Sequence, residues 1–389
     1  MNNKSIRAIL KKNTMLIVLI IVYLFFVIMT KGAMFSPANF SELINQNAYV
    51  FILGAGMLMC MLTGGNIDLS VGSFVCLVCA FGGIFLTIKH MSVGVTIGLM
   101  LLIGIVYGVI LGFLIAYIRI PPWIATLAGF LAFRGWGTAI LRTKSPETSS
   151  ILFSENFNHI FFGRLFQTAP GKWNIPALVF GVLAAVAIIA LSLLSRSSKL
   201  KKGYEADSLT YTLVKSILEG AVIMLFMFKF AKDGGIPTTF LWVAIVLAIY
   251  AFITEKTTIG RHFYVVGGNS EAARLSGIDT RKVMFLAYLN MSILTTLAGM
   301  TVVSRNQAAI ADLGKNFEMA AISACVVGGV STSGGSGTIL GMVVGALLIG
   351  VINLGMSLIS LDANWQRVIK GVVLLAAVVF DILSKKKEK

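Results

Sequence analysis

A polar, glycine-containing stretch, residues 63–73, lies between two apolar runs. It contains Asn66, Asp68, Ser70 and Ser73. A carboxylate at bilayer depth costs about 3 kcal/mol unless it is hydrated or paired, and such residues are typical of transport pathways. Asp68 and Ser70 are equally suited to cap the helix that follows, because carboxylate and hydroxyl oxygens accept its free amide hydrogens. The sequence therefore predicts either a pathway-lining role or a capping role for this stretch.

A second polar segment, residues 267–278, has the pattern of a short capped helix. Asn269 suits the N-cap and Gly277 the helix end. Ala272 and Leu275, three residues apart, share one face. We expect an amphipathic helix that is either a rigid docking site for a soluble partner or a solvated helix at the membrane surface. The candidate residues of this segment are Gly267, Gly268, Asn269, Glu271, Ala272, Ala273, Arg274, Leu275, Ser276 and Gly277.

Small residues dominate a third segment, residues 331–337, and the apolar run after it. Gly341 and Gly345 recur at four-residue spacing, which lets helices pack closely in lipid. A weak internal echo links residues 60–65 with residues 325–329, since in both a cysteine precedes a glycine pair that leads into another apolar run. Glycine-broken segments in two halves of a chain are typical of duplicated transporter folds with a pathway near the breaks.

Motifs for catalysis and nucleotide binding are missing from the sequence. It has no GxxxxGK[ST] phosphate-binding loop and no HExxH zinc motif. The four cysteines lie inside apolar runs, where Cys76 and Cys79 are interpreted as small apolar residues on one helix face, and the three histidines are far apart. We predict no catalytic residue, metal site or cofactor in this chain, so an ATP-driven mechanism requires an ATPase on another chain.

The elements that must position these segments are transmembrane helices. Of the 389 residues, 57% are hydrophobic and 12% are charged, and the mean hydropathy is +0.90, values outside the range of water-soluble domains. Twelve apolar runs lie at roughly 15–29, 47–62, 67–88, 93–118, 123–141, 175–194, 213–231, 238–254, 283–303, 319–330, 338–360 and 365–383. Glycine pairs interrupt or adjoin the runs near 67 and 319. We predict an all-α integral membrane protein, a polytopic helical bundle of about 10–12 transmembrane helices with glycine-broken segments.

Basic residues predict the orientation. The net charge of +16 comes from Lys and Arg at the ends of apolar runs, a topology signal and not a nucleic-acid groove. If all twelve runs cross, 18 basic residues face the side of both termini and 10 face the other side, which places both termini in the cytoplasm. The predicted parts are a cytoplasmic segment 1–14, a permease domain 15–383 that begins with a retained first helix, an external loop 142–174, a cytoplasmic loop 255–282 and a basic tail 384–389.

The predicted external loop is rich in phenylalanine. Its aromatic residues at near-helical spacing are Phe153, Phe157, Phe161, Phe162 and Phe166. They predict either an interfacial helix along the membrane or a docking surface for an external partner.

Three segments carry a resemblance to a known family. Residues 65–73, residues 267–278 and the stretch from residue 334 through Asn353 resemble the permeases of ribose, xylose, arabinose and galactose ATP-binding-cassette importers. The basic segment 196–202 and the run after it lengthen the chain, as in the xylose and multiple-monosaccharide branch. The resemblance implies a bacterial inner-membrane homodimer or close pair with a sugar pathway along its axis. It also implies a cytoplasmic ATPase subunit, which binds ATP and Mg and contacts the helix in residues 269–278. A further implied partner is an external sugar-binding protein.

The predicted function is therefore the permease subunit of a monosaccharide importer that alternates between outward-open and inward-open states. The pathway candidates are Asn66, Asp68, Ser70, Ser73 and Asn353. The alternative is an ion-coupled secondary transporter, for which Asp68, Glu318 and Asp381 are the available carboxylates.

Overall fold

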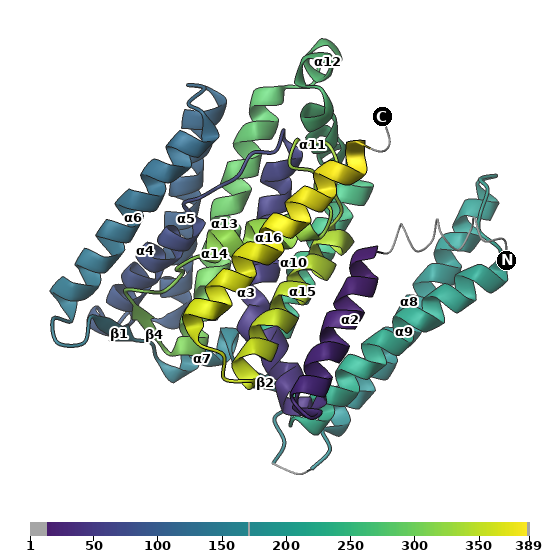
Figure 1. The fold of residues 1–389 in the computed structure, drawn as a ribbon, viewed down its shortest axis with the longest axis horizontal. Coiled ribbons are helices and arrows are strands. Elements are labelled where there is room, and N and C mark those ends of the chain that lie inside the picture. Colours follow the sequence, from purple (N-terminus) through teal and green to yellow (C-terminus); the bar gives the residue numbers. More distant parts are fainter. Residues whose placement is uncertain (1–13, 170–171, 387–389) are drawn as a thin grey trace. The chain divides into compact units, whose positions relative to one another are not determined.

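The computed structural model describes residues 14–169 and 172–386 and is almost entirely helical (Figure 1). Most of the predicted segment 1–14 and residues 387–389 of the predicted tail lie outside the described residues. The helices are α2 (Thr14–Met29), α3 (Pro37–Leu62), α4 (Val71–Gly83), α5 (Val93–Ala116), α6 (Pro122–Lys144), α7 (Glu155–Phe161), α8 (Ile175–Lys201), α9 (Leu209–Lys232), α10 (Thr238–Lys256), α11 (Thr258–Gly268), α12 (Ser270–Leu275), α13 (Thr280–Asn306), α14 (Phe317–Val327), α15 (Ile339–Leu358) and α16 (Ala363–Lys386), with short turns η1 (Ala33–Phe35) and η2 (Ile84–Ile88). The predicted all-α fold is confirmed.

Eight of the described helices are long and apolar enough to cross a membrane. They are α3, α4 with its continuation η2, α5, α6, α8, α10, α13 and α15. The apolar helices α2 and α14 are shorter, and α9 and α16, each of 24 residues, overlap two further predicted runs. Every one of the twelve predicted runs thus overlaps a helix, and the protein is a multi-pass membrane protein.

Two of the predicted runs contain breaks, as their glycine pairs predicted. Helix α3 ends at Leu62, and α4 begins only at Val71. Helix α14 has 11 residues, about 16 Å of helix and so about half of a hydrocarbon layer. Residues 328–338 then connect it to α15. The doubt about the run near 319 as a full span is therefore confirmed, whereas α4 with η2 (Val71–Ile88) is long and apolar enough to cross a membrane, so the doubt about the run near 67 was wrong.

Four short strands were not predicted. β1 (Ser150–Leu152) pairs antiparallel with β4 (Ala308–Ile310), and β2 (Arg164–Leu165) pairs antiparallel with β3 (Ile236–Pro237). The β1–β4 pairing brings the connection after α6 to the connection after α13. Figure 1 shows α12 at the end of the helices opposite to β1, β4 and α7. We call these two ends the α12 end and the β1–β4 end. Both belong to the larger of the two units of the chain described below, unit 1.

Three segments predicted as loops contain more helix than expected. Helix α8 continues to Lys201, so the basic residues from 196 to 201 lie on its last turns and the connection is residues 202–208. The predicted cytoplasmic loop 255–282 contains α11 and α12. Helix α7 lies within the predicted external loop, and its Phe157 and Phe161 are 0% and 2% exposed. These two phenylalanines pack inside the protein and form no docking surface, which corrects that part of the prediction.

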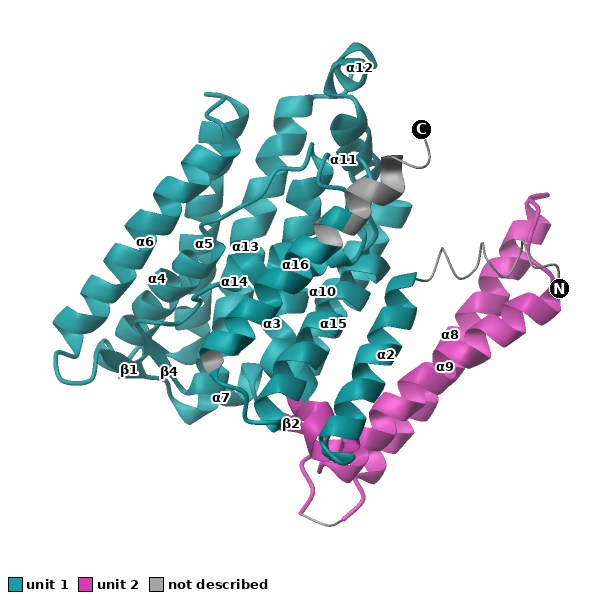
Figure 2. Cartoon of the chain, in the orientation of Figure 1, with its two compact units in different colours: residues 1–34, 43–162, 239–389 teal, residues 35–42, 163–238 magenta. Residues whose placement is uncertain are grey.

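The chain forms two compact units (Figure 2). Unit 2 comprises residues 35–42 and 163–238, and unit 1 comprises the other described residues. In unit 2, α8 and α9 lie side by side as a hairpin, and glycine makes their approach possible: a Cβ at Gly181 would lie 2.7 Å from Met227 Cβ. Arg164 and Asp233 form a salt bridge of 2.7 Å at the base of the hairpin.

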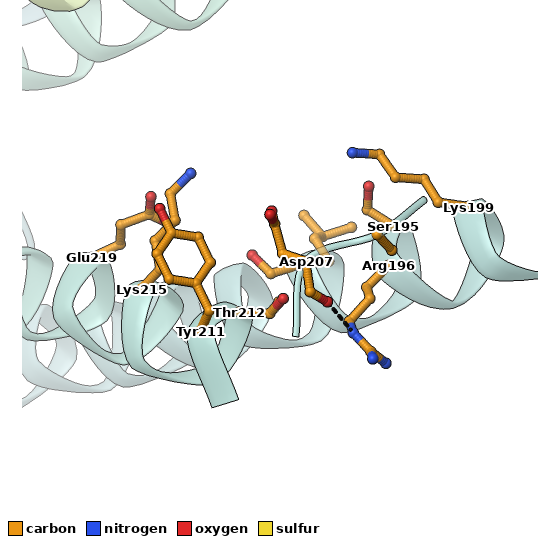
Figure 3. Close-up of a pocket in the computed structure, with 11 residues that line it drawn as sticks. Ser195, Arg196, Lys199, Asp207, Tyr211, Thr212, Lys215 and Glu219 are labelled. Atoms are coloured by element: carbon orange, nitrogen blue, oxygen red, sulfur yellow. Dashed lines mark hydrogen bonds between the residues drawn. The ribbon is translucent and has the colours of Figure 1, made fainter. Parts of the chain in front are cut away.

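The opposite end of the hairpin has a shallow hollow of about 310 Å³ (Figure 3). Arg196, Lys199, Lys215 and Glu219 are among its lining residues, and Arg196 Nε donates a hydrogen bond of 2.9 Å to the Asp207 carbonyl oxygen. None of the 11 lining residues is buried. A hollow lined by solvated side chains offers no fixed polar group to a ligand, so it is no candidate site.

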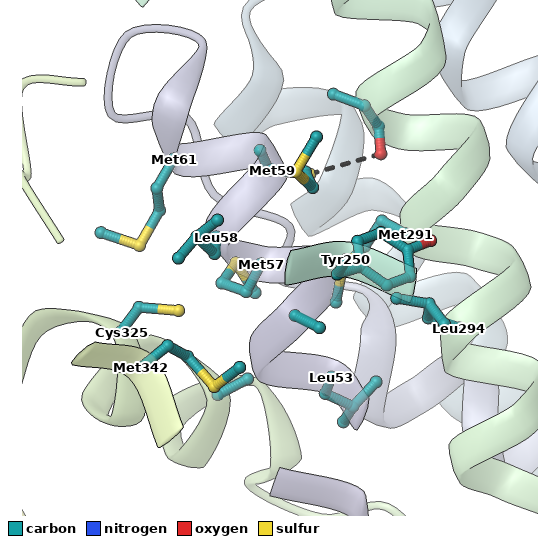
Figure 4. Close-up of a cluster of buried hydrophobic side chains, with 14 of the residues drawn as sticks. Leu53, Met57, Leu58, Met59, Met61, Tyr250, Met291, Leu294, Cys325 and Met342 are labelled. Atoms are coloured by element: carbon teal, nitrogen blue, oxygen red, sulfur yellow. Dashed lines mark hydrogen bonds between the residues drawn. The ribbon is translucent and has the colours of Figure 1, made fainter. Parts of the chain in front are cut away.

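The core of unit 1 is rich in methionine and cysteine (Figure 4). Glycines of α3 admit methionines of neighbouring helices: a Cβ at Gly54 would lie 2.7 Å from Met342 Sδ, and one at Gly56 would lie 2.6 Å from Met291 Sδ. Cys325 Sγ donates to the Gly54 carbonyl oxygen at 3.3 Å. Because methionine is flexible and fills irregular gaps, this core can repack with small changes of side-chain conformation.

Candidate functional site

Helix α12 begins and ends as its sequence predicts. Asn269 is the N-cap, and its Oδ1 accepts hydrogen bonds from the amides of Glu271 and Ala272 at 3.1 and 3.0 Å. Gly277 has a φ of +83°, and the next amide, of Ile278, donates to the Ala273 carbonyl oxygen at 3.0 Å. A left-handed glycine is the common way to stop a helix. The predicted short capped helix is confirmed.

The surface of α12 is polar with one apolar side chain. Glu271 and Arg274 form a salt bridge of 2.6 Å on the surface, an i,i+3 pairing that the sequence interpretation missed. Hydrogen bonding to Arg274 and its charge lower the pKa of Glu271. Leu275 is 77% exposed, whereas Ala273 is fully buried. The helix thus exposes Leu275 and the Glu271–Arg274 ion pair, and it packs against the rest of unit 1 through Ala273.

Helix α11, which supports α12, was not predicted. Thr257 Oγ1 caps it by accepting from the Gly260 amide at 3.0 Å, and Phe263 and Val266, 2% and 3% exposed, pack inward. In the sequence, Thr257 followed by Phe263 and Val266, two apolar residues three positions apart, is the pattern that could have predicted α11. Tyr264 Oη donates to the Gly337 carbonyl oxygen at 2.9 Å. Helix α11 is therefore bonded directly to the glycine-rich segment before α15.

Gly267, the last but one residue of α11, lies against the break after α3. A Cβ at this position would lie 1.6 Å from the Leu62 carbonyl oxygen and 2.7 Å from the Gly335 amide nitrogen. Only glycine permits this approach, since real Cβ atoms do not come that close to backbone. At the adjacent Gly268, a Cβ would meet no heavy atom of the described residues within 4 Å. The position of Gly267 thus has no room for a Cβ, whereas the position of Gly268 has room for one.

The two broken segments also meet each other. The Gly335 amide donates to the Leu62 carbonyl oxygen at 3.1 Å. A Cβ at Gly65 would lie 1.9 Å from the Thr332 carbonyl oxygen, and one at Gly334 would lie 2.5 Å from Gly64 Cα. Three glycine segments far apart in the sequence, residues 64–65, 267–268 and 334–335, therefore form one backbone junction. We call it the glycine junction.

Asp68 lies in the break between α3 and α4 and is 1% exposed. Its Oδ1 accepts from the Ser70 amide at 2.8 Å and from the Ser70 hydroxyl at 2.5 Å. The Ser70 hydroxyl also lies 2.6 Å from the hydroxyl of Tyr107 on α5. Ser70 occupies the N-cap position of α4, but its side chain accepts no helix amide. Asp68 thus holds Ser70, the residue before α4, in place through hydrogen bonds. Capping of α4 by the Ser70 side chain, one of the roles predicted from the sequence, is not observed.

The other pathway candidates lie in two places. Asn66 Nδ2 donates to the Thr63 carbonyl oxygen at 3.1 Å, so it stays within the same break. Ser73 is buried in the first turn of α4, and its hydroxyl has no hydrogen-bond partner in the part of the chain that the structure describes. Asn353 lies on α15 instead, where its Nδ2 donates to Asn47 Oδ1 of α3 at 3.1 Å. The structure therefore brings four of the five candidates together and places Asn353 in a separate polar region.

The family described as "branched-chain amino acid transport system / permease component" matches residues 39–378. The chain belongs to this permease family. The xylose transport system permease protein of Haemophilus influenzae is 33% identical to this permease over 373 residues, 96% of each chain. The corresponding xylose protein of Escherichia coli strain K12 is 31% identical over 376 residues, 96% of this permease and 92% of the relative.

A ribose import permease protein, also of Escherichia coli strain K12, is 29% identical over 347 residues, 89% of this permease and 86% of the relative. The resemblance to sugar-importer permeases is thus confirmed, and the higher identity to the xylose proteins agrees with the predicted branch. No solved structure matches this permease.

Proposed function

We propose that this permease is the membrane subunit of an ATP-driven importer of xylose or a related pentose or hexose in the bacterial inner membrane. The named relatives, xylose and ribose permeases matched over most of their length, support the substrate class. In this proposal the α12 end faces the cytoplasm, both termini lie on that side, and the β1–β4 end faces outward. A second copy of the permease completes the pathway, and an external sugar-binding protein delivers the substrate.

The partner that hydrolyses ATP is a separate cytoplasmic subunit, because no phosphate-binding loop is present in the permease sequence. Helix α12 is the element suited to contact that subunit. Its cap and left-handed stop make it a rigid knob, and Leu275 is exposed where no lipid covers it in the proposed orientation. An exposed large apolar side chain with a charged pair beside it is the composition of a docking point for a protein cleft.

The glycine junction is the single observation that carries the mechanism. Gly267 follows Tyr264 on α11, and it approaches Leu62 and Gly335 so closely that a shift of α11 must displace both broken segments. If the ATPase moves α12 and α11, backbone contacts therefore transmit the movement directly to the Asp68 stretch and to the segment before α15. Hinged breaks of this kind absorb rearrangements in alternating-access transporters. The methionine-rich core beside the junction can adapt to both arrangements.

The test is a comparison of assembly and transport in a double variant, Glu271→Ala with Arg274→Ala. Both side chains are exposed, so we expect normal insertion of the permease. If the ATPase holds the pair in a water-free cleft, the loss of these contacts weakens the association of the permease with the ATPase. The tagged permease, captured from its own membranes, should then retain less ATPase and take up less labelled xylose. Association and uptake at the level of the unchanged protein would remove α12 from the mechanism.

A further inference from the structure

A polar hollow in unit 1 is not among the features used above to argue the proposed function. It consists of two adjoining cavities of about 250 and 430 Å³ that share Tyr49, Lys315, Asn353, Gln366 and Lys370. We call it the amide hollow, because six carboxamide side chains line its smaller cavity: Asn45, Gln46, Asn47, Asn306, Asn353 and Gln366. Its walls come from α3, the end of α13, the connection to α14, α15 and α16. We propose that the amide hollow binds one neutral monosaccharide as the outer part of the transport pathway, an inference that rests on the proposed function.

Asn353 supplies the argument for a hydroxyl group as ligand. The side chain is 6% exposed, and its Nδ2 donates to Asn47 Oδ1 at 3.1 Å while Asn47 Nδ2 donates to the Leu43 carbonyl oxygen at 2.8 Å. This chain of bonds leaves Asn353 Oδ1 as a buried acceptor with no partner among the described residues. A buried acceptor is costly to leave unpaired and needs an O–H or N–H donor. A sugar hydroxyl supplies that donor.

An aromatic pair provides the complementary apolar surface. The rings of Tyr49 and Phe317 stack with centroids 3.8 Å apart and planes 17° apart, and both residues line the smaller cavity. Ligand sites combine such apolar faces with a few fixed polar groups, and the combined size of the hollow is that of a small-molecule site. A sugar ring has both surfaces, C–H groups on its faces and hydroxyls at its edge. The lining, which also contains the charged residues Arg305, Asp312, Lys315 and Lys370, therefore offers both surfaces that a neutral monosaccharide requires.

The hollow also adjoins the Asp68 stretch. Glu318, the residue after Phe317, is 4% exposed, and its Oε2 would lie 2.3 Å from a Cβ at Gly72 in the first turn of α4. Gly314, which lines the smaller cavity, is also close to Gly72, because its carbonyl oxygen would lie 2.1 Å from a Cβ there. The hollow thus borders directly on the start of α4. A rearrangement of the broken segments would change this wall, which connects sugar binding in the hollow to the coupling proposed above.

The test measures protection of a cysteine by sugar in membranes that contain the complete importer. The four native cysteines are buried, so labelling by a soluble maleimide reports mainly on an introduced thiol. Asn306→Cys places that thiol at an exposed lining position, and Asn364→Cys is an exposed control outside the lining. Saturating D-xylose or D-ribose should slow labelling at position 306 at least about threefold and leave position 364 unchanged.

A second substitution assigns the protection to the hollow. Asn353→Leu should raise the sugar concentration for half-maximal protection about tenfold, because the buried acceptor is lost. Its matched control is Asn158→Leu, since Asn158 Oδ1 is also buried with no partner among residues 14–169 and 172–386 but lies outside the hollow. Tyr49→Phe should preserve protection and Tyr49→Ala should weaken it. Size-exclusion profiles and the sugar-free labelling rate identify variants that fail to fold.

The outcomes separate this inference from the proposed function. ATP-dependent uptake of labelled xylose without sugar protection at position 306 would overturn the hollow and leave the function intact. Protection that follows phosphatidylglycerol content instead of sugar would assign the hollow to a lipid headgroup and overturn the inference. Failure of the importer to take up any pentose or hexose would overturn the proposed function itself.

Discussion

Replacement of Gly267 by alanine is the sharpest perturbation of the glycine junction. The added Cβ would lie 1.6 Å from the Leu62 carbonyl oxygen and 2.7 Å from the Gly335 nitrogen, both backbone atoms that no side-chain rotation can move. Such overpacking costs about 1–3 kcal/mol, and the better helix propensity of alanine returns about 0.5–1 kcal/mol. We expect Gly267→Ala to lose about 1–2 kcal/mol of stability after the backbone shift that this contact forces. Gly268→Ala is the matched control, because its Cβ meets no heavy atom in the described part of the chain within 4 Å.

Two measurements on the purified importer separate stability from coupling. Thermal unfolding of the permease should begin at a lower temperature for Gly267→Ala and at the same or a higher temperature for Gly268→Ala. ATP hydrolysis by the assembled complex should lose its dependence on substrate only in Gly267→Ala, because α11 can no longer rest against the two broken segments. Capture of the ATPase should be normal in both, since α12 is unchanged.

Equal behaviour of the two variants would refute this reasoning. If Gly267→Ala unfolds and couples like Gly268→Ala, the close approach at Leu62 does not transmit movement. If both lose the ATPase, the effect belongs to the start of α12 and not to the junction.

Three further predictions concern the motif, the pair and the orientation. Asp68→Leu should lower the abundance of the permease in the membrane, because two hydrogen bonds from Ser70 lose their acceptor at a cost of about 1–3 kcal/mol. Asp68→Asn retains an acceptor and should be abundant. Fluorescence-detected size exclusion measures the abundance of both variants. The lowered pKa of Glu271 means that its pairing with Arg274 contributes above the ordinary pKa and is lost only as the pH falls through the lowered value, so ATPase capture should not vary between about pH 5.5 and 8. Reporter fusions after residue 204 should be cytoplasmic and fusions after residue 148 external; the opposite result at residue 204 would reject the orientation.

Hydropathy predicted most of the fold, because lipid permits few structures. All twelve apolar runs overlap helices, and the glycine pairs correctly marked both breaks. The β1–β4 pairing could not be predicted, since it joins residues 156 to 160 positions apart through strands of three residues. Likewise, the extension of α8 to Lys201 was missed because charged residues at the end of an apolar run resemble a loop.

The site was predictable where its bonds are local. The Asn269 cap and the Gly277 stop involve residues within five positions of each other, and both were predicted. Contacts over long separations were not: Tyr107 with Ser70, Tyr264 with Gly337 and Asn47 with Asn353 each join segments that are far apart in the sequence. The sequence showed three glycine segments but not that they meet, because backbone approach depends on packing that no single segment encodes.

Uptake by proteoliposomes that contain the purified importer tests the central claim most directly. The permease, with the ATPase captured from its own membranes and its sugar-binding protein, should accumulate labelled xylose or a related monosaccharide only when ATP is present on the side of α12. Collapse of proton and sodium gradients should leave that uptake unchanged. Uptake by the permease alone that requires an imposed ion gradient and no ATP would contradict the account.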